Sequence, residues 1–206
     1  VQAMSWAPTT NPYDGNGGYV ISDPVGSIKT NPLSMLYDTE NIRERTFVNV
    51  MGGMRYEIIP GLSADFQAAA DLAFFDNKNW SGEYASNHQP SASKSSSKSR
   101  TIQTTTQLSY DRTLAKVHHI NAVVALETQK YNWESLSGNA SNLKFADLKY
   151  DNLAQAGSVS AGSDYSMWAL LSYLGRINYT LMDRYLFSIS VRRDGSSKFA
   201  KGNKFS

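Results

Sequence analysis

The sequence contains no cysteine and only three histidines. The absence of cysteine removes disulfides and thiol chemistry, and it fits passage through an oxidising periplasm. No apolar run approaches 18 residues, so the sequence predicts no membrane-spanning helix. Residues 1–10 lack the basic start and apolar core of a signal peptide, as expected of either a mature exported chain or a piece of one.

Strong charge of either sign is also missing. The 206 residues carry 20 Lys and Arg against 18 Asp and Glu, a net charge of +2. This mild balance predicts no nucleic-acid partner, because such proteins present strongly basic surfaces. The length suits a single domain.

What the chain does have is a series of segments with alternating apolarity. Each is predicted to be one extended strand: 45–57, 62–75, 101–111, 119–131, 166–181 and 185–194. The links between them are in turn short and long: 58–61, 76–100, 112–118, 132–165 and 182–184. In an antiparallel up-and-down sheet this puts all short turns at one end and all long loops at the other. That layout is typical of a transmembrane β-barrel, so the predicted fold is all-β.

The strand lengths favour the same interpretation. Strands in soluble domains usually run about 5 to 6 residues. Residues 62–75, tilted by about 45°, would span roughly 30 Å, the thickness of a hydrocarbon core. This Ala-rich segment also fits a helical stripe, but the Pro60-Gly61 turn before it favours a strand.

Successive side chains of a strand point to opposite faces, which predicts one apolar and one polar face. The side chains predicted to face lipid include Phe66, Leu72, Ile102, Leu108, Val124, Leu126, Ile177, Tyr179, Phe187 and Ile189. Those predicted to face the lumen include Asp65, Asp71, Arg176 and Arg192. An Arg facing lipid at mid-depth would cost about 2 to 4 kcal/mol, so this register is favoured.

Four tyrosines lie beside the predicted short turns: Tyr56, Tyr110, Tyr179 and Tyr185. They would suit an interfacial aromatic girdle. The alternative is that Tyr is simply common in strands.

No catalytic or metal-binding pattern is found. His118 and His119 would point to opposite faces of a strand, so they are interpreted as a turn pair. Asp65 and Asp71 would lie roughly 20 Å apart, too far for a glycosidase pair. Gly15–Gly18 lacks the Lys-Ser/Thr of a phosphate loop. The sequence therefore predicts a non-enzymatic protein with no catalytic residue, no cofactor site and no metal site.

The long links hold the remaining candidates. Ser91–Arg100 is a low-complexity tract interpreted as a mobile loop, with a basic contact to lipopolysaccharide or a partner as the alternative. The aromatic residues in or beside the links are Trp80, Tyr84, Trp133, Tyr150 and Trp168. They are predicted to contact a ligand or partner. Packing among the loops is the alternative.

Three stretches resemble the SusC/RagA family of TonB-linked outer-membrane proteins. They are "NPLSMLYDTENIRERT" (31–46), "MRYEIIPGLSADF" (54–66) and "SYLGRINYTLMDRYLFSISVRRDGSSKFAKGNKF" (172–205). The last is the most specific, and "KVHHINAVVALETQ" (116–129) adds weaker support.

The resemblance implies a location in the bacterial cell outer membrane, in contact with its lipid, and about six strands of a plugged barrel of about 22 strands. Residues 1–44 would be an extracellular loop region and 45–206 part of the barrel. Such proteins import oligosaccharides or peptides with a SusD-like lipoprotein as partner. The family's plug and TonB-contacting box have no counterpart here, so contact with the TonB complex is expected through a missing N-terminal part.

Two other classes stay open at this point. A soluble all-β glycan-binding module would explain the loop aromatics, and a passive porin would explain the strands. Six strands cannot close a membrane barrel, because the smallest single-chain examples have eight. The chain is therefore expected to be an internal segment that does not fold alone.

Overall fold

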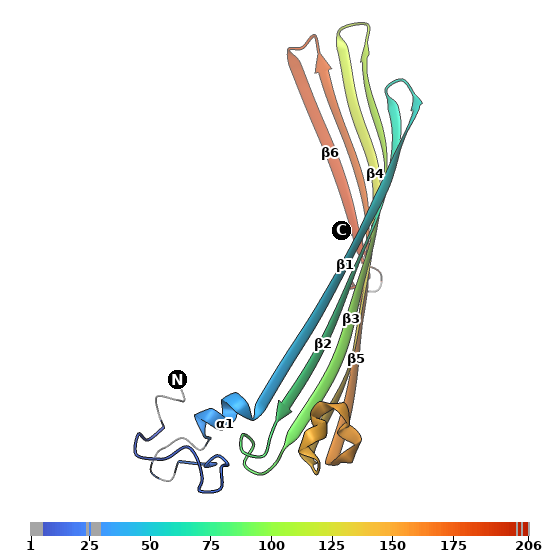
Figure 1. The fold of residues 1–206 in the computed structure, drawn as a ribbon. Coiled ribbons are helices and arrows are strands. Elements are labelled where there is room, and N and C mark those ends of the chain that lie inside the picture. Colours follow the sequence, from blue (N-terminus) through green and yellow to red (C-terminus); the bar gives the residue numbers. More distant parts are fainter. Residues whose placement is uncertain (1–5, 24, 26–29, 201, 203, 206) are drawn as a thin grey trace. The chain divides into compact units, whose positions relative to one another are not determined.

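The computed structural model describes residues 6–23, 25, 30–200, 202 and 204–205. Its elements are α1 (Pro32–Tyr37), β1 (Thr39–Ile59), β2 (Leu62–Ser81), β3 (Ser91–Leu114), β4 (His118–Leu143), the 3-10 helices η2 (Ala146–Asp151) and η3 (Leu153–Gln155), β5 (Ala156–Leu181) and β6 (Tyr185–Ser196). The strands form one sheet in chain order, β1 to β6 (Figure 1). The prediction of an all-β, antiparallel up-and-down arrangement is therefore confirmed. Within these described ranges, no helix is long and apolar enough to span a membrane.

The chain divides into two compact units; β1 to β5 contribute residues to both, and β6 lies in one. The loop-side unit comprises residues 1–46, 74–97 and 134–164, and it holds α1 and the connections 82–90 and 144–155. The turn-side unit comprises residues 47–73, 98–133 and 165–206, and it holds all three short turns. Short and long connections are thus segregated, as the link lengths predicted.

The short turns depend on left-handed backbone positions. Gly61 has φ of 88°, and a Cβ atom there would lie 2.5 Å from the carbonyl oxygen of Asp111 on β3. The other two turns place Ala115-Lys116 and Met182-Asp183 at φ between 49° and 59°. Two consecutive positive φ values match the twist of a tight antiparallel hairpin.

The pairing of β5 with β6 tests which residues share a face. Ile177 lies opposite Ile189, and Tyr179 lies opposite Phe187, so four residues from one predicted face meet on one side of the sheet. Arg176 lies opposite Ser190 on the other side. The predicted register of this hairpin is confirmed.

The predicted long loops are wrong in their extent. Residues 76–81 and 91–100 are strand, so the β2–β3 connection is only 82–90, and the β4–β5 connection is 144–155 rather than 132–165. The tract Ser91–Arg100 is the first part of β3 and not a mobile loop. Apolar alternation cannot reveal a strand whose two faces are both polar. Such a strand is held by its backbone ladder and by cross-strand side-chain bonds such as Asn79–Ser93 and Asn77–Ser95.

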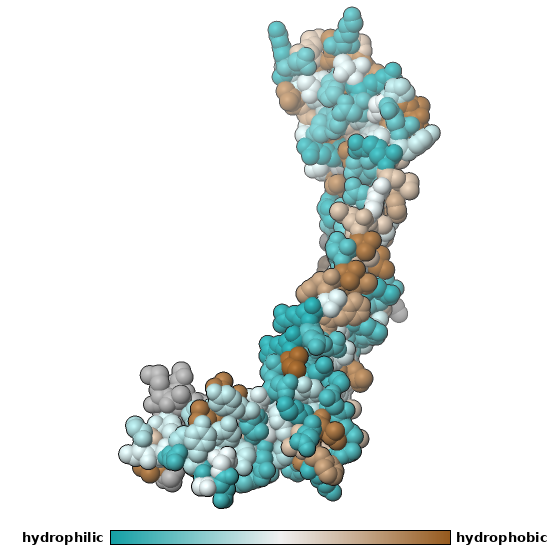
Figure 2. Space-filling model, viewed as in Figure 1, coloured by the Kyte–Doolittle hydropathy of each residue, from teal (hydrophilic) through white to brown (hydrophobic). Residues whose placement is uncertain are grey.

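Few apolar side chains are buried. Among the described residues the buried hydrophobic ones are Trp80, Ala92, Ala125, Ala140 and Leu143. In the turn-side unit, by contrast, Val124 is 65% exposed and Ile189 is 70% exposed. Figure 2 shows apolar (brown) side chains lying in patches on the surface of the strands. Most of the predicted lipid-facing side chains, among them Val124, Ile177 and Ile189, are thus left exposed by the rest of the described chain.

Candidate ligand-binding surfaces on the polar face and the loops

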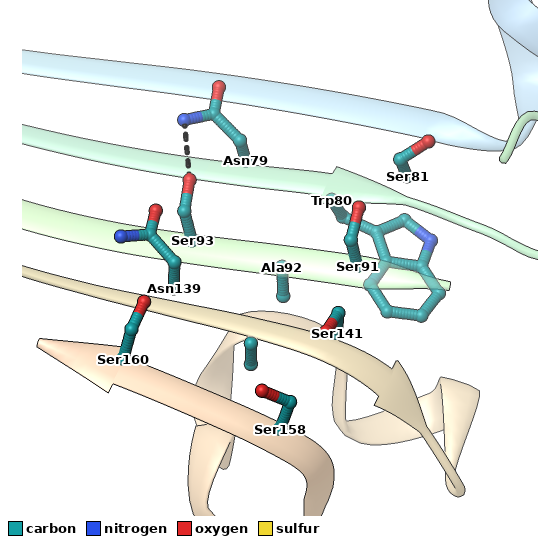
Figure 3. Close-up of a pocket in the computed structure, with 11 residues that line it drawn as sticks. Asn79, Trp80, Ser81, Ser91, Ala92, Ser93, Asn139, Ser141, Ser158 and Ser160 are labelled. Carbon is teal, nitrogen blue, oxygen red and sulfur yellow. Dashed lines mark hydrogen bonds between the residues drawn. The ribbon is translucent and has the colours of Figure 1, made fainter. Parts of the chain in front are cut away.

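A polar hollow of about 390 Å³ lies within the loop-side unit. It is lined by side chains of β2 to β5: Asn79, Trp80, Ser81, Ser91, Ala92, Ser93, Asn139, Ala140, Ser141, Ser158 and Ser160 (Figure 3). The Asn79 side-chain amide donates to the Ser93 hydroxyl at 3.1 Å. The lining offers hydroxyl and amide groups without a formal charge, which suits hydrogen bonding to a neutral polar ligand.

The alternation of each strand explains this hollow. Asn79 and Ser81 continue the face of β2 that carries Asp65 and Asp71, and Ser91 and Ser93 continue the polar face of β3. Because small side chains occupy neighbouring positions on adjacent strands, the surface is hollowed there. The hollow therefore belongs to the face predicted to line the lumen.

A small apolar cluster adjoins this hollow and shares Trp80, Ala92 and Ala140 with its lining. Trp80, Ala92, Ala140 and Leu143 are buried together, and Tyr150, Leu153 and Ala156 pack against them. Trp80 is only 6% exposed. The structure thus brings two of the predicted contact residues, Trp80 and Tyr150, into one packed cluster. Contact of either with a ligand stays a prediction.

Polar contacts fasten the β4–β5 connection beside this cluster. Glu40 accepts hydrogen bonds from Lys149 Nζ at 2.6 Å and from Tyr150 Oη at 2.8 Å. Lys78 Nζ lies 5.9 Å from the centre of the Tyr150 ring. The hydrogen bond from Lys149, followed by that from Tyr150, lowers the pKa of Glu40, and the bond to Glu40 raises the pKa of the Tyr150 phenol.

Tyr84 lies in the β2–β3 connection, in a different aromatic group. Its ring meets Tyr19 edge-on at 5.6 Å, and Tyr19 lies 5.7 Å from Tyr13. The Asp38 carboxylate accepts from the backbone amides of Tyr84 and Ala85 at 2.8 and 3.1 Å. Sequence reasoning missed Tyr13 and Tyr19. Nothing in the spacing of residues so far apart in the chain indicates that they meet.

Trp168 and Trp133 lie in the turn-side unit, on β5 and β4. Trp168 stacks on Tyr131 with ring centres 5.3 Å apart, and Lys198 Nζ lies 5.8 Å from the Trp168 ring. Tyr131 was not predicted as a site residue. The signal was available, since Tyr131 continues the polar face of β4 after Glu127 and Gln129.

The charged residues predicted to face the lumen contact polar neighbours. Asp65 pairs with Arg55 at 2.5 Å, and Asp71 accepts from Asn49. Arg192 pairs with Asp194 at 2.9 Å and with Glu127 at 3.1 Å. Arg176 Nε donates to Asn178 at 3.2 Å. Each charge thus has a partner on its own strand or a nearby strand, while the lumen assignment stays a prediction.

The two neighbouring histidines have separate partners. His118 Nδ1 lies 2.7 Å from the Tyr179 hydroxyl, and His119 Nδ1 lies 3.2 Å from the Thr113 hydroxyl. No group of three or more His, Cys, Asp or Glu residues suited to a metal ion occurs in the described part of the chain.

Comparison with known proteins gives no matching protein-family model. TonB-dependent receptor P26 of Formosa agariphila is 25% identical over 98% of this chain and 21% of the receptor. TonB-dependent receptor SusC of Bacteroides thetaiotaomicron is 56% identical over 36 residues, which are 18% of this chain and 4% of SusC. The chain resembles SusC/RagA-type TonB-dependent receptors. It spans about a fifth of the length of the curated relatives that match almost all of it.

Solved structures show the same fold as this SusC/RagA-like chain. A structure of the RagAB peptide transporter superposes with a TM-score of 0.81 at 21% identity, covering 95% of this chain and 23% of that one. The RagAB peptide importer in its "open-open" state gives a TM-score of 0.79 at 22% identity, covering 95% of this chain and 22% of that one. The predicted resemblance and the predicted location in the bacterial outer membrane are confirmed.

Proposed function

We propose that this chain is a wall segment of a TonB-dependent outer-membrane transporter, a barrel of about 22 strands. The transporter imports oligosaccharides or peptides with a SusD-like surface lipoprotein and is not an enzyme. Contact with the TonB complex is assigned to a part of the receptor outside these 206 residues. Residues 1–44 are assigned to the extracellular side and 45–206 to the barrel.

The observation that carries the proposal is the uncovered apolar face of the sheet. A soluble sheet buries such a face against a second layer, whereas Phe187 and Ile189 here are 60% and 70% exposed. Burying a side chain of this size is worth about 1.5 to 3 kcal/mol. Lipid provides that burial without a second protein layer, which disfavours the soluble glycan-binding module.

Strand length supports the same proposal. A tilted strand needs about 9 to 11 residues to cross a membrane, while β2 to β5 have 20 to 26. The surplus extends β2 to β5 beyond the hydrocarbon into the loop-side unit, where Asn79, Ser93 and Asn139 lie on the strands. The Ser- and Asn-lined hollow there is the candidate contact surface for a neutral cargo.

Uptake by cells that express the full-length receptor tests the transport function. Fluorescent oligosaccharides and fluorescent peptides are offered separately to cells with and without the receptor, and again after loss of TonB. We expect uptake of one cargo class that requires both the receptor and TonB. Uptake that persists without TonB would favour the passive porin, and receptor-independent uptake of both classes would contradict the proposal.

Surface labelling tests the orientation of the strands. Single cysteines are introduced into the full-length receptor at Ser86 and Asp147 in the longer connections, and at Pro60 and Arg184 in the short turns. A membrane-impermeant thiol reagent on intact cells should modify the first pair and spare the second. The reverse pattern would contradict the assigned orientation.

A further inference from the structure

The apolar face of the turn-side unit contains a hollow of about 400 Å³. Its floor is made by Gly52, Ala68 and Ala70, where small residues fall side by side on β1 and β2. Larger apolar side chains border it: Val50, Met54, Phe66 and Ile102. Such a hollow has the chemistry of an acyl-chain contact, because its lining is almost wholly apolar and it opens on an exposed face.

Two cations lie beside this hollow on the same face. Arg100 is two residues before Ile102 on β3, roughly 7 Å along the strand. Counting along the antiparallel strands from the Thr104–Thr128 hydrogen bond at 2.7 Å places Ile102 opposite Lys130. The same count places Arg100 opposite Asn132, whose side-chain amide lies 3.3 Å from the Arg100 guanidinium. Arg100 and Lys130 are both exposed.

The position of Arg100 and Lys130 along the strands indicates the depth at which they would lie in a membrane. The apolar face of β3 runs from Ile102 to Tyr110, and that of β4 runs from Ile120 to Thr128, nine residues each. Nine residues that rise about 3.3 Å each and are tilted by about 35 to 45° cover roughly 21 to 24 Å, close to the apolar band of about 25 Å in an outer-membrane barrel. Arg100 and Lys130 follow immediately on the side away from the short turns. With the long connections on the extracellular side, as proposed above, they would stand at the level of the headgroups of the outer leaflet.

We infer that Arg100, Lys130 and the adjoining apolar hollow form a binding site for a phosphorylated, acylated lipid of the outer leaflet. The hollow would contact an acyl chain, and the two cations would bind the phosphate of the headgroup. A guanidinium suits phosphate because its planar fork donates two parallel hydrogen bonds. The inference rests on the proposed function, since it requires this face of the sheet to lie in the membrane.

The test uses the full-length receptor, purified in non-ionic detergent and titrated with monophosphoryl lipid A in native mass spectrometry. A cation near a lipid surface contributes about 1 kcal/mol, or roughly fivefold in affinity. The Arg100→Ala/Lys130→Ala double variant should therefore bind about 25-fold more weakly. The matched control is Arg112→Ala/Arg184→Ala, which removes two exposed cations near the short turns and should bind like the wild type.

Two further binding experiments identify the chemical group that the site recognises. The same lipid without its phosphate should bind the wild-type receptor about as weakly as phosphorylated lipid binds the double variant. Inorganic phosphate at matched concentration should not compete. Effective competition by phosphate alone would identify a free-anion site and overturn the lipid assignment.

A filling variant tests the hollow separately. A Cβ atom at Gly52 would meet nothing within 4 Å, so Gly52→Leu can enter the hollow while keeping the face apolar. It should weaken lipid binding without reducing barrel assembly. Wild-type affinity in both Gly52→Leu and the double variant would overturn the inference.

A separate measurement on the same purified receptor tests the proposed function. Recovery of the receptor from the outer membrane, with a heat-dependent gel shift, supports the barrel whether or not lipid binding depends on Arg100 and Lys130. A receptor that is absent from the outer membrane would contradict both the barrel and the lipid site.

Discussion

Glu40, at the start of β1, holds the β4–β5 connection through Lys149 and Tyr150. Its pKa is lower in the folded chain than in the unfolded chain, chiefly because of the hydrogen bond from Lys149. The stabilising contribution is therefore complete above the ordinary carboxyl pKa of about 4.3. It is lost as the pH falls through the lower folded value.

A fluorophore on Asp147→Cys in the full-length receptor should report this loss. The chain has no other cysteine, so a single site is labelled if the rest of the receptor is cysteine-free. We expect a change in probe emission below about pH 4, and no such change when Glu40→Gln is also present. An identical acid transition in the Gln variant would show that Glu40 does not control the connection.

Asn31 makes three contacts that tie the N-terminal segment to α1. It is fully buried, and its amide nitrogen donates to the carbonyl oxygens of Pro12 and Val20 at 2.6 and 2.9 Å. Its side-chain oxygen accepts from the backbone amide of Leu33 at 2.9 Å and so caps the helix. Asn31→Ala would leave these groups unsatisfied, at about 1 to 3 kcal/mol each.

Limited chymotrypsin digestion of the full-length receptor measures the effect of Asn31→Ala. Cleavage within residues 6–23, which contain Tyr13 and Tyr19, should be faster than in the wild type. Asn16→Ala is the control, because Asn16 is exposed and its side chain makes none of these contacts. Equal cleavage of all three proteins would show that Asn31 does not hold the segment.

At the scale of single strands, a strand could be predicted from the sequence only where one of its faces is apolar. The segments 62–75 and 185–194 were found as strands because their alternation is strong, and β2 and β6 contain them. The tract 91–100 was missed because Ser occupies one of its faces, and Lys, Ser and Arg occupy most of the other. Likewise, the cluster of Trp80 with Tyr150 joins residues 70 positions apart, so no local pattern reveals it.

Substitutions on the two faces of β2 and β6 test the face assignment. Phe66→Arg and Ile189→Arg put a cation on the exposed apolar face, which should cost about 2 to 4 kcal/mol near mid-depth of a membrane. Both should reduce heat-modifiable, assembled receptor in the outer membrane. Ser190→Ala and Asp65→Ala, on the polar face, should assemble normally. If both pairs assemble equally well, the register is wrong.

At the scale of the whole molecule, β1 and β6 are the two edges of the sheet. Edge strands present unpaired backbone groups, and in lipid each such group costs several kcal/mol. The similarity to receptors about five times longer is consistent with closure of the barrel by other strands.

Residues 1–206 expressed alone should therefore fail to form a barrel. Refolded into detergent, they should aggregate and show no heat-dependent gel shift, whereas the full-length receptor treated in the same way should show one. A monodisperse, water-soluble monomer with a cooperative melt would contradict the membrane assignment. The face that carries Phe66 and Ile189 would then have to pack against a second layer, as in a soluble sandwich.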